Sequence, residues 1–217
     1  GYIDDFDKIN GKNLYDHYQE ILKTSCIEFV VIGKQKEDEL IKNIKKYFIF
    51  KDRKEITVIK VPEIISSKKE KPTIEKEELN IVQGKICMGI RTNIKNTGME
   101  FYNFVIMNEI LGGGTNSKLF RNVREKESLC YNIFSFIYRF KSIVMIQCGV
   151  DKENFEKTIK LIGNEIDNLS NGDVSQDELK NAKIGLLKNF ESMKDYPSSI
   201  VNFYITQYML GDKDNIF

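Results

Sequence analysis

Apolar residues recur at helical spacing in two N-terminal stretches, with a short apolar run between them. Residues 11–23 and 36–48 each place their apolar side chains on one helical face. Between them, residues 26–32 form a continuous apolar run that ends at Gly33, a pattern typical of a buried strand. One strand cannot satisfy its own edges, so it needs sheet partners from the next domain or from one upstream. We favour an upstream domain, of which residues 1–50 would be the end.

A more polar stretch, residues 51–77, follows this first piece. It contains Pro62, Pro72 and the charged run at 68–71, and its apolar residues are sparse. Such a composition is typical of an interdomain linker, here with a possible short strand at 56–61. A second domain is therefore expected over residues 78–217.

The second domain shows the period of strands and the period of helices in the order β-α-α-β-β-α-α-α. The expected elements are a strand at 79–94, helices at 98–111 and 117–126, a hairpin of strands at 129–139 and 142–150, and helices at 151–169, 176–194 and 198–210. This order predicts an α+β sandwich, with one mostly antiparallel sheet and helices packed on one face.

Several residues are expected to begin, end or fill these elements. Asn96 or Thr97, Asp151, and Ser175 with Glu178 are predicted N-terminal caps, and Pro197 opens the last helix. Gly112 is a predicted helix stop. The alternating aromatic residues of the hairpin are expected to be core beneath the helices rather than a binding groove; they are Phe134, Phe136, Tyr138 and Phe140.

Charge and cysteine content narrow the class of protein. The 33 basic and 32 acidic side chains nearly cancel and are interleaved, which indicates neither a nucleic-acid partner nor a membrane surface. No apolar stretch approaches the roughly 20 residues that span a bilayer. The four cysteines lie in strand-like runs without metal-binding spacing. We expect them to be buried free thiols in a reducing compartment, which favours the cytoplasm.

Residues 111–131 (LGGGTNSKLFRNVREKESLCY) combine a glycine triplet, a short helix and the start of a strand. Glycines before a helix can bind phosphate, but the P-loop Gly-Lys-Ser/Thr and the Rossmann spacing are both missing, and a break between two helices explains the glycines. The stretch resembles the GGG-x-x-S-R/K-L-F-x-x-V-R-E-K-x-x-L-x-Y motif of M16 (insulinase/pitrilysin-like) zinc metallopeptidases. It departs from that motif at Ser128, where glycine is usual, and at Lys118, where arginine is common.

The resemblance implies an M16-type sandwich and a division of the chain. Residues 1–50 would be the C-terminal part of a first module, and residues 78–217 most of a second module, the half that does not hold zinc. In this family the matching Arg and Tyr reach across to the zinc site on the other half. Arg124 and Tyr131 are therefore the implied substrate-binding residues, since a guanidinium and a phenol can hold a peptide carbonyl or its oxyanion. The alternative is that Arg124 pairs with Glu125 or Glu127 and Tyr131 packs in the sheet.

The zinc site of the family is H-x-x-E-H on a helix, with two histidine ligands and a glutamate as general base. This chain has a single histidine, His17, and Ile21 stands where the second would be. It also has no further histidine for a Ser–His or Cys–His pair. We therefore assign no catalytic residue and no metal ligand, expect zinc only in an upstream module or a partner subunit, and expect the chain alone to be inactive.

Two functions follow from the resemblance. In the first, the chain is a fragment of an M16-like zinc peptidase, or its zinc-less partner subunit, that binds peptide and closes the chamber together with a zinc-bearing half. In the second, it is a degenerate M16-like module that acts only in protein–protein assembly. Retention of both Arg124 and Tyr131 favours the first, because a scaffold has no chemical need for that pair.

Overall fold

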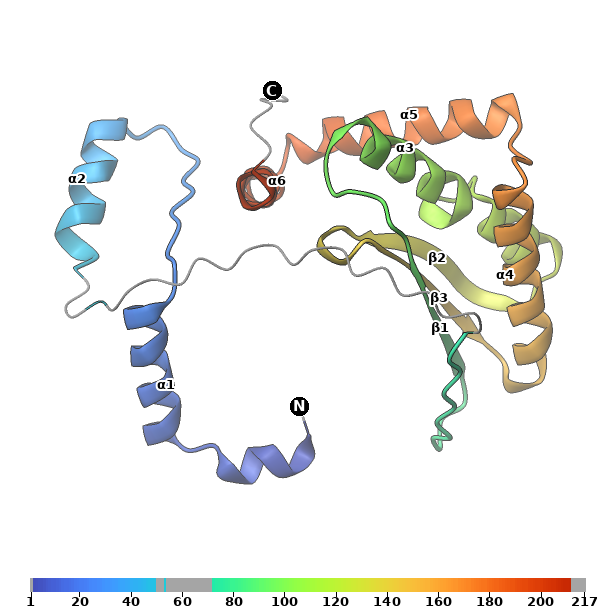
Figure 1. The fold of residues 1–217 in the computed structure, drawn as a ribbon, viewed down its shortest axis with the longest axis horizontal. Helices are drawn as coiled ribbons and strands as arrows, with labels where there is room; N and C mark the ends of the chain where they lie inside the picture. Colours follow the sequence, from blue (N-terminus) through green and yellow to red (C-terminus); the bar gives the residue numbers. More distant parts are fainter. Residues whose placement is uncertain (1, 50–52, 54–71, 212–217) are drawn as a thin grey trace. The chain divides into compact units, whose positions relative to one another are not determined.

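The structure is a computed structural model that describes residues 2–49, 53 and 72–211 (Figure 1). The chain divides into two compact units, Gly1–Val61 and Pro62–Phe217, and each is considered by itself. Most of the predicted linker, with the possible strand at 56–61, lies outside the described residues. The described residues 72–83 contain no helix or strand. The predicted boundaries at residues 50 and 78 therefore stay a prediction.

Two amphipathic helices make up most of the described N-terminal unit. After a 3₁₀ turn at Ile3–Lys8 come α1 (Gly11–Thr24) and α2 (Glu37–Tyr47), both at predicted positions. Asn10 caps α1, because its side-chain oxygen accepts hydrogen bonds from the backbone N–H groups of Lys12 and Asn13, each at 3.0 Å. No residue of either helix is buried, so their apolar faces lack a core to pack on within the described part of this unit.

The strand predicted at residues 26–32 is wrong. The segment runs between α1 and α2 with a single bridge at Ser25 and no strand ladder. Phe29 packs edge-on against Phe48, with ring centroids 4.7 Å apart, yet it remains 42% exposed. A strand needs neighbours that accept and donate its backbone hydrogen bonds, and the described part of this unit offers none.

Three antiparallel strands form the sheet of the C-terminal unit. Their order is β1 (Gly84–Arg91), β3 (Ile143–Val150), β2 (Cys130–Tyr138). β2 and β3 are the predicted hairpin, joined by a 3₁₀ turn at Arg139–Lys141. β1 is shorter than the predicted strand at 79–94, since its pairing spans only the length of β3, which lies between the other two strands.

The described part of this unit contains four α-helices. They are α3 (Gly98–Asn108), α4 (Phe155–Ser170, after a 3₁₀ turn at Lys152–Asn154), α5 (Gln176–Met193) and α6 (Pro197–Leu210). In Figure 1, α3 and α4 lie on the same side of the sheet, and α5 lies beyond α3. Phe104 of α3 and Ile162 of α4 share one buried core with Val144 and Ile146 of β3. The predicted α+β architecture is confirmed.

The helix ends agree with the sequence where capping is local. Ser175 and Glu178 form the predicted capping box of α5, in which the Glu178 N–H donates to Ser175 Oγ at 3.1 Å and the Ser175 N–H donates to the Glu178 carboxylate at 2.9 Å. Pro197 is the first residue of α6. Thr97 precedes α3 but its side chain makes no capping hydrogen bond.

The aromatic residues of β2 do not lie beneath the helices, and that prediction is wrong. Ile133 and Ser135 are buried and face α3, so the alternate residues Phe134, Phe136 and Tyr138 project from the opposite face. Their rings follow one another with centroids 6.0 and 5.2 Å apart. Phe134 and Tyr138 are 40% and 51% exposed, and Phe140 falls in the 3₁₀ turn.

The cysteine prediction is half right. Cys130 and Cys148 are buried free thiols on neighbouring strands, whereas Cys26 and Cys87 are free and exposed. Cys87 is exposed because it alternates with Ile86, which takes the helix-facing position on β1. The cellular compartment stays a prediction.

Candidate functional site

The glycine triplet shapes the start of the site, though not as a helix stop. α3 continues into a π-helical turn at Glu109–Gly113, and Gly112 has φ −157° rather than the left-handed conformation of a C′ glycine. A Cβ on Gly112 would lie 2.7 Å from both the backbone N and Oγ of Ser135, and 3.0 Å from Leu119 Cδ1. The missing side chain therefore lets the end of this helix pack directly on β2.

The motif helix follows this turn and is anchored by buried apolar side chains. It begins at Lys118 and continues as a π-helical segment, Phe120–Lys126. Leu119 and Val123 are fully buried in the core. Because a helix with one anchored face must turn its other face outward, Arg121 and Arg124 are left toward the surface.

Lys118 connects the motif helix to α5. It is only 5% exposed, and its Nζ lies 3.2 Å from the Glu178 carboxylate and 3.7 Å from that of Asp173. Arg121 pairs with the same Glu178. Burial raises the pKa of Glu178, but the Ser175 N–H and the two cations outweigh it, and the net effect is a lowered pKa. A residue at the start of α5 thus fixes the motif helix.

Arg124 is held by its own helix and by the strand that follows. Its Nε donates a hydrogen bond to the main-chain oxygen of Tyr131 at 2.9 Å, and its Cζ lies 4.4 Å from the centroid of the Phe120 ring. It forms no ion pair with Glu125 or Glu127 within the described residues, and Glu127 pairs instead with Lys157 at 2.9 Å. The alternative that Arg124 is an ordinary surface ion pair with these neighbours is wrong.

Tyr131 is also fixed, by a residue that the sequence did not indicate. Its side chain is 57% exposed, and its hydroxyl donates to the Asp151 carboxylate, with Oδ1 and Oδ2 at 2.9 and 3.0 Å. This hydrogen bond, together with the negative charge of Asp151, raises the pKa of Tyr131. Asp151 was predicted to cap a helix, but it makes no capping hydrogen bond and α4 begins only at Phe155.

A β-bulge explains why Tyr131 projects from the edge of the sheet. Cys130 is opposite Val150 and Asn132 is opposite Gly149, so Tyr131 has no partner of its own on β3. The Asn132 side chain takes over part of the ladder, because its Oδ1 accepts a hydrogen bond from the Gly149 N–H at 2.8 Å. The alternative that Tyr131 packs within the sheet is therefore wrong.

The two predicted site residues are thus joined, through the main chain rather than between their side chains. The terminal nitrogens of Arg124 make no hydrogen bond or ion pair among the residues that the structure describes. They remain permanent, pre-positioned donors, which suits binding of a carbonyl or a developing oxyanion. Asp151 adds a fixed carboxylate, and its only sequence signal was its place directly after β3.

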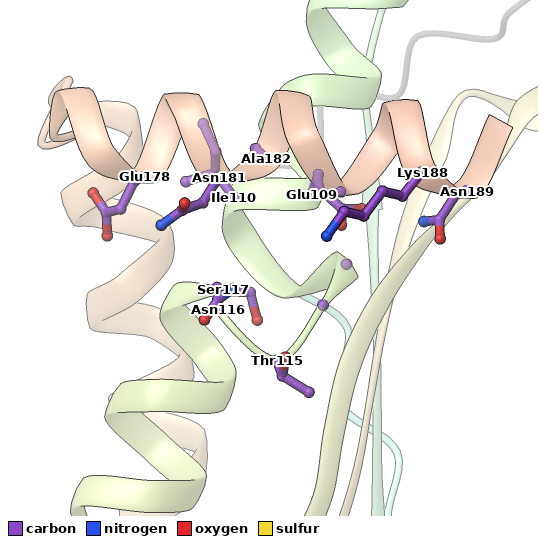
Figure 2. A pocket seen from close by; sticks show the side chains of 13 residues that line it. Glu109, Ile110, Thr115, Asn116, Ser117, Glu178, Asn181, Ala182, Lys188 and Asn189 are labelled. Atoms are coloured by element: carbon purple, nitrogen blue, oxygen red, sulfur yellow. The ribbon is translucent and has the colours of Figure 1, made fainter. Parts of the chain in front are cut away.

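A cavity of about 260 Å³ lies between residues 113–117 and α5 (Figure 2). Its α5 wall is formed by side chains at helical spacing along one face, so polar residues replace the apolar ones usual on an inward face. That wall consists of Glu178, Asn181, Ala182, Gly185, Lys188 and Asn189. The floor includes Glu109, at the end of α3. Sequence reasoning did not identify this cavity.

The described residues do not form the zinc site of the motif. His17 lies on the exposed surface of α1 with Ile21 one turn later, and no group of His, Cys, Asp and Glu in the described part of the chain is placed to hold a metal ion. Over the same residues, no helix is both long and apolar enough to cross a bilayer.

A family comparison places this site in context. The family model described as the peptidase M16 inactive domain matches residues 8–186. The chain belongs to the peptidase M16 family. The match contains both helices of the N-terminal unit, the glycine loop, Arg124, Tyr131 and Asp151.

Relatives within the M16 family carry two kinds of description. The chain is 32% identical over 183 residues to the "Probable inactive metalloprotease YmfF" of Bacillus subtilis, covering 84% of this chain and 42% of that protein. It is 25% identical over 177 residues to the "Uncharacterized zinc protease YmxG" of the same organism, covering 80% and 41%. The chain thus spans less than half the length of these M16 relatives.

Solved structures share the fold. A conserved protein from Enterococcus faecalis matches 99% of the chain, and 50% of its own length, with a TM-score of 0.84 and 22% identity. A protease from Helicobacter pylori matches 98% of the chain, and 52% of its own length, with a TM-score of 0.67 and 16% identity. At these identities the likeness concerns the M16 fold alone.

Proposed function

We propose that this chain supplies the zinc-free part of an M16-type peptidase, where it binds the peptide through Arg124 and Tyr131 and helps to close the chamber. The observation that carries the proposal is the fixed guanidinium of Arg124. One edge is bonded to the Tyr131 carbonyl and one face lies over Phe120, while the terminal nitrogens stay available. A donor that is immobilised before the substrate arrives loses little conformational freedom on binding.

Arg124 would act on the carbonyl of the peptide bond to be cleaved. Its terminal nitrogens can donate to the carbonyl oxygen in the ground state and more strongly to the oxygen as negative charge develops. Its stack on Phe120 keeps the guanidinium plane from turning away. The residue would therefore contribute chiefly to the rate of the chemical step, with a smaller contribution to ground-state binding.

Tyr131 would have a different role while its hydroxyl donates a hydrogen bond to Asp151. The hydroxyl hydrogen points to the carboxylate, so the phenolic oxygen retains only acceptor capacity. In that state it can accept a hydrogen bond from a peptide N–H, and it donates to a carbonyl only after leaving Asp151. We therefore assign Arg124 to the carbonyl and Tyr131 to main-chain positioning.

The zinc-bearing half has two possible sources, and the relatives support both. The relative called an inactive metalloprotease favours a zinc-less subunit that works with a separate zinc-bearing partner. The relative called a zinc protease favours a longer chain whose upstream module holds the metal. In either case the peptide, and the half that cuts it, are partners of the chain described here.

A second candidate is a module that acts only in assembly, and one observation is compatible with it. The apolar residues of α1 and α2 are exposed, including Leu14 at 60% and Tyr47 at 69%, and such surface normally packs against another domain or chain. This surface fits a larger assembly under both candidates. What separates them is Arg124, for which an assembly module has no use.

The test is peptidase activity of the protein extended upstream by one full module, with and without o-phenanthroline, beside the 217-residue chain alone. If the extended form is inactive, a zinc-bearing partner is added. In whichever form is active, Arg124→Ala should lower kcat/KM by about 100-fold or more, mostly in kcat. Lys126→Ala, which removes an exposed charge from the same helix, is the matched control and should leave activity unchanged.

Three outcomes would contradict the proposal. Activity of the 217-residue chain alone would place catalysis where we assign none. Equal activity of the Arg124→Ala and Lys126→Ala variants would remove Arg124 from the mechanism and favour assembly. Retained assembly with no peptidase activity under any pairing would do the same.

A further inference from the structure

Glu109 carries a carboxylate that has no ion-pair partner in the part of the chain that the structure describes. It lies half-buried at the end of α3, in the floor of the cavity under α5. No hydrogen bond or ion pair to it is found among the described residues, whereas Glu178, which lines the same cavity, is paired with Lys118 and Arg121. Removing a carboxylate from water without a partner is unfavourable, and burial accordingly raises the pKa of Glu109.

Glycines keep open the space around this carboxylate. A Cβ on Gly113 would overlap Glu109 Oε2, and a Cβ on Gly114 or Gly185 would lie 3.1 Å from Oε1. The glycines come from both walls, two from the loop and one from α5. A side chain at position 113 would force the carboxylate to move, and one at position 114 or 185 would crowd it by a few tenths of an ångström.

The remaining lining offers hydrogen-bond acceptors and a small volume. Figure 2 shows Asn181 and Asn189 beneath α5, facing the loop that carries Thr115 and Asn116. These side-chain oxygens can accept hydrogen bonds from a ligand that already neutralises Glu109. At about 260 Å³ the cavity is smaller than the roughly 300–1,000 Å³ typical of sites for drug-sized ligands, so it suits one side chain or a small ion.

From these features we propose that the cavity is a binding site for an organic monocation, a guanidinium or an ammonium group, which pairs with Glu109. A planar guanidinium can bond both carboxylate oxygens at once while its other N–H groups reach the amide oxygens. Where the proposed function holds, the natural ligand is a basic side chain of the bound peptide, and that step rests on the proposed function. The binding site itself does not.

Lys188 is the internal competitor for this role. Its side chain lines the same cavity, but it forms no ion pair with Glu109 within 4 Å in the described structure. A lysine on a flexible stem can move toward the carboxylate when the cavity is empty and withdraw when a ligand enters. Removal of the Lys188 charge should therefore strengthen binding of an external cation. If Lys188 and Glu109 instead formed a permanent pair, the wild-type chain would not bind an external cation.

The experiment is a titration of the 217-residue chain with Nα-acetyl-arginine amide, followed by NMR and by calorimetry. The neutral isostere Nα-acetyl-citrulline amide is the ligand control. We expect the arginine compound to bind about tenfold or more tightly than citrulline and to shift resonances of residues 113–117 and the α5 wall. Lys188→Met should increase the affinity.

Two carboxylate variants separate the site from general electrostatics. Glu109→Gln should abolish the preference for arginine over citrulline, and Asp177→Asn, which removes an exposed charge from the first turn of α5 outside the cavity, should preserve it. Circular dichroism checks that each variant is folded, and Gly185→Ala, which crowds Oε1, should weaken binding if Glu109→Gln does not fold.

Three results would overturn the inference. The two compounds could bind equally well, neither the wild-type chain nor the Lys188→Met variant could bind the arginine compound, or the preference for arginine could survive Glu109→Gln. Because this assay needs no peptidase activity, its failure leaves the proposed function standing. Conversely, a failed peptidase assay leaves the monocation site intact and removes only the assignment of its ligand to a peptide.

Discussion

The hydroxyl of Tyr131 is bonded to both carboxylate oxygens of Asp151, 20 residues further along the chain, at 2.9 and 3.0 Å. Tyr131 lies at the start of β2, and Asp151 directly follows the end of β3. The hairpin therefore brings them to the same end of the sheet. The pairing decides which hydrogen bonds the phenol can offer to a ligand. The effect of the Asp151 charge on the pKa of Tyr131 can be measured directly.

Asp151→Asn should lower the pKa of Tyr131 toward its ordinary value of about 10, because the charge that opposes ionisation is gone. The measurement is a spectrophotometric pH titration of the phenolate, and subtraction of the Tyr131→Phe titration isolates this residue from the other tyrosines. Asp167→Asn, on α4, is the control. An unchanged pKa in Asp151→Asn would mean that the hydrogen bond does not persist in solution.

Gly112→Ala should destabilise the protein by about 2 kcal/mol, since the new Cβ would collide with the backbone N and Oγ of Ser135. Gly163→Ala is the matched control, because Gly163 lies inside α4 with nothing within 4 Å of its Cβ position. At that position alanine should raise the free energy of unfolding by about 0.5–1 kcal/mol, because its helix propensity exceeds that of glycine. Urea denaturation of both variants tests this, and effects of the same sign would contradict it.

Glu178→Gln should cost about 3 kcal/mol near neutral pH, because it leaves the buried Lys118 without its principal partner. Lys118→Met combined with Glu178→Gln should recover most of that loss. The folded-state pKa of Glu178 is lowered, so its stabilising effect is present above the unfolded value of about 4.3 and is lost as pH falls through the folded value. Wild type and Glu178→Gln should therefore converge in acid, which thermal denaturation across pH would reveal.

Ser128→Gly should stabilise the chain by about 0.5 kcal/mol. Ser128 has φ +51°, and the strain of a left-handed non-glycine residue slightly exceeds the extra backbone entropy that glycine loses on folding. Ser142 has φ +49° but is buried, and its hydroxyl donates to the Ile94 carbonyl at 2.7 Å. Ser142→Gly should therefore destabilise, and denaturation midpoints that shift in the same direction would argue against this distinction.

The features that the sequence predicted correctly are those with local causes. The periods of α1 and α2 and the capping box of Ser175 and Glu178 depend on residues three or four apart. The hairpin depends on two strands joined by a short turn. The substrate-binding role of Arg124 and Tyr131 came from the family resemblance and stays a prediction. The structure shows only that the Arg124 side chain donates a hydrogen bond to the main-chain oxygen of Tyr131.

The features that the sequence did not predict depend on which distant segments of the chain pack against them. Residues 26–32 have the composition of a strand but no neighbour in the described part of their unit. Phe134 and Tyr138 are as apolar as core residues, yet the helices take the other face of β2. Asp151 precedes a helix as a capping residue would, but its carboxylate accepts a hydrogen bond from the Tyr131 hydroxyl, which the hairpin brings close, and not from the start of the helix. Glu109 is a charged residue that nothing in the sequence marks as buried, and its burial comes from the packing of α5 nearby.

The bulge at Tyr131 also sets the parity of β2. Cys130 on one side of it and Ile133 on the other both face the helices, an odd separation that a regular strand cannot give. A deletion of one residue here would not merely shorten the strand. It would remove the bulge, and Cys130 and Ile133 would still face the helices at the even separation of a regular strand. The bulge thus lets β2 carry one more outward-facing residue than β3 opposite it without moving any core residue to the other face.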